Sequence, residues 1–246
     1  MLSGGRPLIV MAMEAEAAPV RSALNLETPG EKLHPAFSSD IWESSRVCLV
    51  LNGEDRRYGV DSIASQPAAI ASLLAIERVR PSLVISAGTA GGFVKRGGHI
   101  GQVCLADSCY FHDRRIPLEA FDAYGNGNYP VVDLGDAGRS LGFQLGAVST
   151  GNALDAPEAD LARMDSYQAV VKDMEAAAVA WVCEQFGIPF TALKVITDLV
   201  DSDESTAEQF VSNFEIATQR LGDAIKEFIE LITTEGEDYA IRAGCR

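Results

Sequence analysis

Positive charge is scarce in this sequence. Twenty Lys and Arg residues stand against 35 Asp and Glu residues, which gives the 246-residue chain a formal net charge of −15. A surface of that sign repels the phosphates of a nucleic acid, so we expect no nucleic-acid partner. Disorder is excluded as well, because 47% of the residues are hydrophobic and 22% are charged, as in a folded globular protein.

Long hydrophobic runs are also missing. The apolar stretches at residues 68–76 and 176–183 each end at a glutamate, well short of the roughly 18 residues that a membrane-spanning helix needs. The stretch at residues 8–13 is preceded by one arginine and followed by Glu14, so it lacks the length and the cleavage site of a secretory signal peptide. We therefore expect a cytoplasmic protein without a membrane partner.

Residues of the kinds that form metal or disulfide sites are few. The five cysteines are odd in number and include no CxxC pair, which favours reduced core thiols and gives no support to a zinc site. Of the three histidines, His112 has no Ser or Cys nucleophile visibly paired with it, so we interpret it as structural or pocket-lining. The cysteines are Cys48, Cys104, Cys109, Cys183 and Cys245.

Short apolar runs bounded by glycine, proline or acidic residues predict buried strands, and helical patterns follow most of them. The clearest helix covers residues 206–232, where apolar residues recur every three or four positions. No linker, repeat or low-complexity tract interrupts the alternation. We therefore predict one α/β domain over residues 1–246, with a mixed, largely parallel sheet flanked by helices and a flexible C-terminal tail at residues 235–246. The predicted strands are residues 7–13, 47–52, 83–87, 103–106, 146–150 and 190–197.

Acidic side chains lie at the ends of several of these elements. Glu14 and Glu16 follow the first strand, Glu175 precedes an alanine-rich helix, and Asp198 ends the last strand. Each of them alone is better explained as a helix-dipole partner, a turn former or a cap. Three acidic positions at three strand ends are harder to explain in this way, because such a sheet brings strand ends together and binds ligands there. We therefore expect a candidate site at this edge.

Residues 86–92, with the sequence SAGTAGG, are rich in glycine. The run matches neither the GxGxxG pattern nor the GxxxxGK[ST] pattern of nucleotide-phosphate loops. A tight structural turn and a loop whose backbone approaches a ligand are about equally compatible with it, since glycine serves both needs.

Several short segments carry a family resemblance. In chain order they are AMEAE (12–16), GVDS (59–62), AGTAGGF (87–93), FHDRRIP (111–117), STG (149–151), KDMEAAAVA (172–180) and TDLVD (197–201). With these segments the chain resembles the 5′-methylthioadenosine/S-adenosylhomocysteine nucleosidases of the purine nucleoside phosphorylase superfamily, in particular their plant-type branch. The resemblance covers about residues 9–214 and implies a nucleoside phosphorylase-like fold.

The resemblance implies cleavage of an adenine N-glycosidic bond by water, with neither an organic cofactor nor a metal ion. It places the water-activating base at Glu16, the acid that protonates the departing adenine at Asp198, and the ribose-binding glutamate at Glu175. These roles fit the chemistry, because cleavage passes through a ribose cation and needs a base for water and an acid, with a raised pKa, for the leaving nitrogen. The other substrate-contacting residues that the resemblance implies are Met13, Thr89, Phe111, Pro117, Leu154, Asp155 and Met174.

The resemblance also implies a homodimer, in which residues 111–121 shape the pocket for the 5′-alkylthio group and reach across to the partner chain. Two departures from the family pattern stand out. Asn152 occupies a position where the family usually has aspartate, and residues 122–139 match poorly, so we expect a variable loop near the pocket there.

Three alternatives remain. A phosphorylase of the same superfamily is disfavoured, because Glu14 and Glu16 stand where phosphate would need arginine or glycine. A hydrolase for another 5′-substituted nucleoside, such as aminodeoxyfutalosine, fits the same motifs. A non-catalytic nucleoside-binding protein is disfavoured by the retention of Glu16, Glu175 and Asp198 together.

Overall fold

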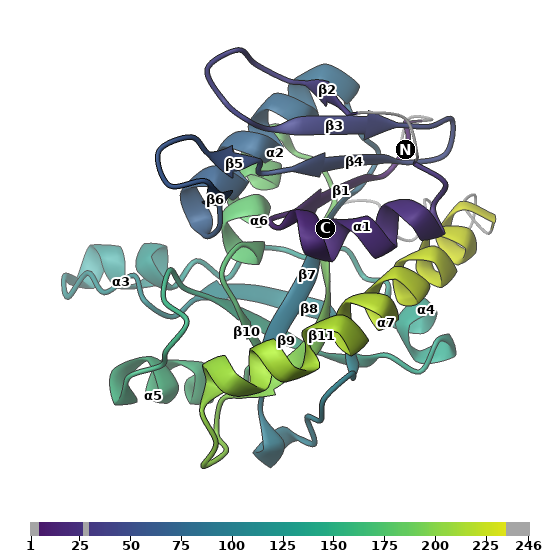
Figure 1. Cartoon of the computed structure of the whole chain (residues 1–246). Coiled ribbons are helices and arrows are strands. Elements are labelled where there is room, and N and C mark those ends of the chain that lie inside the picture. Colours follow the sequence, from purple (N-terminus) through teal and green to yellow (C-terminus); the bar gives the residue numbers. More distant parts are fainter. Residues whose placement is uncertain (1–4, 27–29, 235–246) are drawn as a thin grey trace.

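The computed structural model describes residues 5–26 and 30–234, and within them nine strands form one mixed sheet (Figure 1). The predicted tail at residues 235–246 lies outside the described residues. The strands of this sheet are β1 (Leu8–Met11), β2 (Glu31–Lys32), β3 (Asp40–Glu43), β4 (Cys48–Leu51), β7 (Val84–Gly92), β8 (Val103–Phe111), β9 (Gln144–Thr150), β10 (Val171–Asp173) and β11 (Phe190–Leu199), in the spatial order β10-β9-β8-β11-β7-β1-β4-β3-β2. The predicted α/β fold class is confirmed.

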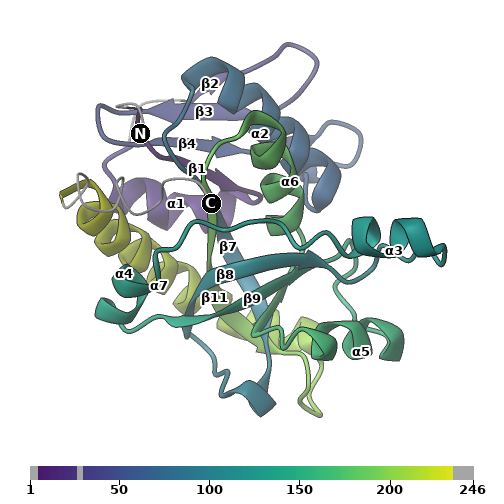
Figure 2. The same cartoon turned by 180° about the vertical axis from the view of Figure 1, so that it is seen from behind.

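Helices cover both faces of the sheet. They are α1 (Glu14–Ala23), α2 (Ser65–Val79), α3 (Glu119–Asn126), α4 (Gly135–Ser140), α5 (Glu158–Ser166), α6 (Ala176–Phe186) and α7 (Thr206–Thr234); a short hairpin of β5 (Glu54–Asp55) and β6 (Val60–Asp61) precedes α2, and a 3-10 turn, η1 (Val94–Arg96), follows β7. Helices α1 and α7 lie in front of the sheet in Figure 1, and α2 and α6 cover the other face, which Figure 2 presents from behind. None of the described helices is long and apolar enough to cross a membrane.

The two faces of the sheet build two separate apolar clusters. Leu8 and Val10 of β1 pack with the alanine-rich faces of α2 and α6, whereas Ile9 and Met11 pack with α1 and α7. This alternation follows from the two-residue period of a strand. Because both faces are covered, the central strands read as continuous apolar runs, which is why periodicity located them in the sequence.

An additional pairing between β10 and β7 joins the end of the sheet back to its middle, so β7, β11, β8, β9 and β10 form a closed ring of strands. Strand β10 was not predicted, because it has three residues and two of them are Lys172 and Asp173. Its pairing places Lys172 opposite Gly91 of β7, and β7 in turn places Gly91 opposite Asp198 of β11. The ring therefore brings three distant parts of the chain to one place.

The glycine-rich residues 86–92 are the last seven of the nine residues of β7, so both the predicted turn and the predicted loop are wrong. The reason is steric. A Cβ atom at Gly91 would lie 2.8 Å from Oδ2 of Asp198, and one at Gly92 would lie 2.4 Å from Cδ1 of Ile196. Glycine here makes room for side chains of the neighbouring strand.

Residues 122–139 also differ from the prediction of a variable loop near the pocket. Helices α3 and α4 occupy parts of the segment, and between them Tyr129 forms an antiparallel bridge with Cys109 of β8. Figure 2 shows α3 standing out from the body of the molecule.

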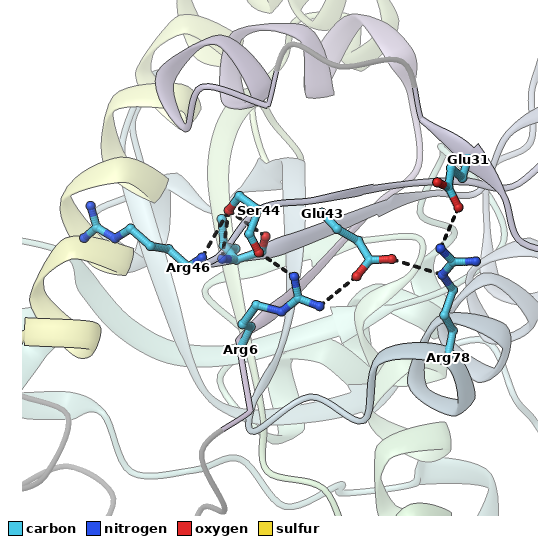
Figure 3. Close-up of polar contacts among 7 residues, drawn as sticks. Arg6, Glu31, Glu43, Ser44, Arg46 and Arg78 are labelled. Atoms are coloured by element: carbon cyan, nitrogen blue, oxygen red, sulfur yellow. Dashed lines mark hydrogen bonds and ion pairs between the residues drawn. The ribbon is translucent and has the colours of Figure 1, made fainter.

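A network of charges ties the start of the chain to the far edge of the sheet (Figure 3). Nη2 of Arg6 lies 2.7 Å from the carboxylate of Glu43 in β3, and Nε of Arg78 in α2 donates to the same carboxylate at 3.0 Å. Arg78 also pairs with Glu31, at 2.6 Å. Burial alone would raise the pKa of Glu43, but the two guanidinium groups outweigh it and lower that pKa.

Candidate active site

A cavity of about 210 Å³ lies at the ends of β1, β7, β10 and β11. It receives the side chains of Glu16, Glu175 and Asp198, which come from three separate strand ends. Four more of the expected substrate contacts line it, namely Met13, Thr89, Leu154 and Met174. The structure thus brings seven of the ten expected site residues to one place.

Glu16 lies in the first turn of α1 and is buried. Its Oε1 accepts hydrogen bonds from the backbone N–H of Thr89, at 2.8 Å, and from the Thr89 hydroxyl, at 2.5 Å. Burial raises the pKa of this carboxyl, and the two donors of Thr89 oppose the rise. A Cβ atom at Gly88 would lie 3.3 Å from the other carboxylate oxygen, so glycine at this position keeps Oε2 accessible.

Glu14 does not belong to the cavity. Its exposed carboxylate pairs with Arg21, about two turns further along α1, and Nη1 of Arg21 lies 2.9 Å from Oε2 of Glu14. The expectation that two carboxylates of this strand end would repel phosphate is therefore corrected, because Glu16 alone faces the cavity.

Asp198 reaches the cavity through a local irregularity of β11. The pairing with β7 shifts between Ile196 and Asp198, so Thr197 is the extra residue and Asp198 stands opposite Gly91. Such a bulge re-aims the side chain that follows it. The Asp198 carboxyl is buried, and the Thr197 hydroxyl lies 2.7 Å from its Oδ1. Burial raises its pKa, while Thr197 and the charge of Lys172 oppose the rise. A raised pKa suits a proton donor.

Glu175 stands between β10 and α6, at the N-cap position of that helix. Its side chain does not cap the helix. Instead, Oδ2 of Asp173 accepts the N–H of Ala176 at 2.8 Å, and Oε1 of Glu175 accepts the N–H of Ala64 at 2.9 Å. Burial raises the pKa of Glu175 to about 7. The alternative interpretation of Glu175 as a first-turn helix residue does not account for this arrangement.

Beneath the cavity lies an ion pair that the sequence analysis missed. Nζ of Lys194 in β11 lies 2.8 Å from Oδ2 of Asp173, with 1% and 0% of the two side chains exposed. Burial opposes both charges, but each stabilises the other, so the pKa of Lys194 is raised and that of Asp173 is lowered. The available signal was a lysine in the middle of the apolar run 190–197.

Three expected site residues do not line this cavity. Phe111 is buried against Tyr129, with their rings edge to face at 6.0 Å, and Pro117 and Asp155 are exposed. His112 is also buried and does not line this cavity; its Nδ1 lies 2.8 Å from Oγ of Ser149.

Asn152, the departure from the family pattern, bridges two elements outside the cavity. Its Oδ1 accepts the N–H of Ser65 at the start of α2, and its Nδ2 donates to Oδ2 of Asp113 at 3.1 Å. An amide can do both, whereas an aspartate could not donate to Asp113.

In the described part of the chain, no group of three or more His, Cys, Asp or Glu side chains is arranged to hold a metal ion. The cysteines in that part, Cys48, Cys104, Cys109 and Cys183, are buried and form no disulfide.

Comparisons with known proteins agree on one family. The model of the phosphorylase superfamily matches residues 7–230. A relative from Arabidopsis thaliana named 5′-methylthioadenosine nucleosidase is 36% identical over 230 residues, which are 92% of this chain and 86% of the relative. A second, named 5′-methylthioadenosine/S-adenosylhomocysteine nucleosidase and from the same plant, is 32% identical over 92% of this chain and 91% of its own. A solved structure of the Arabidopsis 5′-methylthioadenosine nucleosidase without ligand matches with a TM-score of 0.89, at 36% identity, over 93% of this chain and 96% of that one.

Proposed function

This chain belongs to the phosphorylase superfamily and, within it, to the 5′-methylthioadenosine/S-adenosylhomocysteine nucleosidases, and on that premise we propose that it hydrolyses the N-glycosidic bond of 5′-methylthioadenosine. The products are adenine and a free 5′-thio-ribose. S-Adenosylhomocysteine, named for the second relative, is the further candidate substrate. Four carboxyl groups line the cavity, and the observation that carries the proposal is that three of them, those of Glu16, Glu175 and Asp198, form no ion pair within the described residues, whereas the fourth, Asp173, is paired with Lys194.

The proposed base is Glu16. A water molecule beside its free Oε2 would give up a proton to the carboxylate as the water attacks the anomeric carbon. Thr89 fixes the position of the carboxylate through Oε1, and the charge of the buried Lys194 favours its ionised form. Thr89 therefore fixes the position of the Glu16 carboxylate, and Lys194 stabilises its negative charge.

The proposed acid is Asp198. Adenine is a poor leaving group as an anion, so a proton must reach one of its ring nitrogens while the bond to the sugar breaks. Burial favours the neutral carboxyl that this transfer needs. After the transfer, the charge of Lys172 stabilises the carboxylate that is left.

Glu175 and Met174 are the proposed partners of the ribose. Positive charge develops on the sugar ring in the transition state, and a carboxylate held by the N–H of Ala64 is placed to stabilise it or to bind the ribose hydroxyls. The methionine provides an apolar surface beside it. This group acts on the sugar, whereas Glu16 and Asp198 act on the water and the base.

Hydrolysis is favoured over phosphorolysis by the charges around the cavity. Among the described residues that line it, Lys172 is the only cation and no arginine is present. The ammonium of Lys172 donates to two backbone carbonyls, and Lys194 below is paired with Asp173. A phosphate ion would meet Glu16 without a free cation to hold it.

A homodimer is part of the proposal. Leu118, at the N-cap of the protruding α3, is 60% exposed, and Phe121 and Tyr124 within that helix are 48% and 56% exposed. Large apolar side chains gathered on one short segment are typical of a protein–protein contact. A partner chain that covered them would bring residues 111–121 into a shared interface, as the family resemblance implies. A cytoplasmic location and a role in methionine salvage are further parts of the proposal.

The test is a base-release assay on 5′-methylthioadenosine, S-adenosylhomocysteine, aminodeoxyfutalosine and inosine, each with and without inorganic phosphate; inosine would release hypoxanthine and the other three adenine. We expect release from 5′-methylthioadenosine at the same rate in both conditions, with free thio-ribose as the second product. A ribose 1-phosphate product would refute hydrolysis. Release from aminodeoxyfutalosine alone would move the assignment to another 5′ substituent, and binding without release would make this a nucleoside-binding protein.

A further inference from the structure

We propose that Lys172 is a positioning residue for the leaving-group side of the cavity: its ammonium fixes the backbone at residues 153–154 and places a positive charge two strands from Asp198, on the same wall of the cavity. This inference rests on the proposed function, since it concerns how the nucleoside is held and how its base is protonated.

The strand ring sets the place of Lys172 relative to Asp198. Lys172 of β10 is opposite Gly91 of β7, and Gly91 is opposite Asp198 of β11. Residues in register on neighbouring strands point to the same face, and both Lys172 and Asp198 line the cavity. Between them stands a glycine, at which any Cβ atom would lie 2.8 Å from Oδ2 of Asp198. Gly91 itself therefore adds no side chain between the two charged groups, and the neighbouring side chain at this point is that of Val200, whose Cγ2 would lie 2.6 Å from the same Cβ atom.

The ammonium group of Lys172 holds a loop that packing alone does not hold. Nζ donates to the carbonyl of Ala153 at 2.6 Å and to the carbonyl of Leu154 at 3.0 Å. The side chain of Leu154 lines the cavity but is 47% exposed, so it has little packing to fix it. The neighbouring Asn152 is tied by Asp113 and Ser65, which leaves Lys172 as the tie for residues 153 and 154 among the hydrogen bonds described.

Burial makes this use of a lysine costly, which is a reason to look for a function. Lys172 is 5% exposed, and burial lowers the pKa of its ammonium. Four carboxyl groups oppose that effect, from Asp198 on β11, Asp173 on β10, Asp155 in the loop and Asp160 on α5. Neutral carbonyls could equally be held by an uncharged donor. The charge itself is therefore the feature that a structural role leaves unexplained.

Two effects follow, and they can be separated by experiment. Without the hydrogen bonds from Lys172, the backbone of Ala153 and Leu154 is no longer held in place beside the cavity, and substrate binding weakens. Loss of the charge leaves Asp198 with only the Thr197 hydroxyl to favour its ionised form, so Asp198 holds its proton to a higher pH. A unit charge two strands away, about 10 Å at an effective dielectric constant of about 20, moves a titration by about one pH unit.

The experiment compares kcat and KM for 5′-methylthioadenosine between pH 5 and pH 10 in the full-length chain and in three variants. Lys172→Met removes both the donors and the charge with little change of volume. Lys172→Gln keeps amide donors and removes the charge. Lys226→Met, at an exposed position of α7 outside the cavity, is the matched control.

For Lys172→Met we expect KM to rise by roughly tenfold, which corresponds to the loss of about one charge-assisted hydrogen bond. We also expect the alkaline limb of the profile of kcat against pH to move to higher pH by about one unit. Lys172→Gln should restore part of the KM and keep the shift of the limb, and Lys226→Met should change neither. If Lys172→Met keeps KM within about twofold of the wild type and the limb stays in place, the inference is overturned. If Lys172→Met does not fold, an unshifted limb in Lys172→Gln overturns it equally. A wild-type chain that releases no adenine refutes the proposed function itself, and with it this inference, which is a different outcome from an active enzyme indifferent to Lys172.

Discussion

Replacement of Asp198 by asparagine tests the proposed chemistry most directly. The amide has the shape of the carboxyl, can accept the hydrogen bond of Thr197 through its oxygen, and can donate its N–H to a purine nitrogen. It cannot transfer a proton. General acid catalysis contributes about 10²- to 10⁴-fold, so we expect kcat to fall by that factor, which raises the barrier by about 2.7–5.4 kcal/mol. Because binding contacts remain, KM should stay within about threefold.

Stability gives an independent check that Asp198→Asn is folded. Burial raises the pKa of Asp198 in the folded state above its value in the unfolded state. At pH 7 this difference lowers the free energy of unfolding of the wild type. The neutral amide removes that penalty, and the free energy of unfolding in urea at pH 7 should be equal to or higher than that of the wild type. The advantage should disappear below the unfolded pKa of aspartate, where both forms are neutral.

The assay is adenine release, measured by chromatography, under saturating and limiting substrate. Asp203→Asn is the matched control, since Asp203 is exposed and does not line the cavity. An Asp198→Asn variant that kept more than about a tenth of wild-type kcat would refute the role of Asp198. No neighbour could easily replace it: Asp173 is held ionised by Lys194, and Asp155 is exposed outside the cavity.

Three further outcomes are expected. Glu16→Gln should lower kcat by at least about 10²-fold in the same assay, because the amide cannot take the proton of water; retention of more than a tenth of the activity would move the base elsewhere. Glu43→Gln should lower the free energy of unfolding by about 0.5–1 kcal/mol at pH 7, the upper range for partly exposed ion pairs. Since the pKa of Glu43 is lowered in the folded state, this difference should be present above pH 4.5 and vanish as the pH falls through the folded pKa; an equal difference in urea unfolding at pH 3 would contradict the ion-pair explanation. Light scattering at micromolar concentration should give a dimer, and a fully active monomer would contradict it.

The strands and the three carboxyl groups could be predicted because their signals are local. Buried strands such as β1 and β4 are continuous apolar runs; Glu16 and Asp198 come at the ends of such runs, and Glu175 comes directly before an alanine-rich helix. A rule about strand ends then places them at one edge without any knowledge of the pairing. What the rule does not give is side-chain direction, which is why Glu14 was grouped with Glu16 although it turns away to Arg21.

The features that were missed depend on which strands lie side by side. Nothing local in residues 86–92 says that Asp198 and Ile196 need the space of two absent side chains, so the glycines looked like a turn. Strand β10 is too short and too polar to show a period, and its pairing with β7 is what closes the ring. Lys194 was visible as a charge in an apolar run, but its partner Asp173 lies on a strand that the sequence did not predict.

The same pairings explain how one cavity can hold carboxyl groups in opposite protonation states. The proposed mechanism needs Glu16 ionised to accept a proton and Asp198 neutral to give one, yet burial raises the pKa of both. The difference comes from their surroundings. Glu16 receives two hydrogen bonds from Thr89 and faces Lys194, whereas Asp198 receives one, from Thr197. Of these two carboxyl groups, Asp198 thus has fewer donors that favour its ionised form, and the charge of Lys172 limits how tightly it holds a proton.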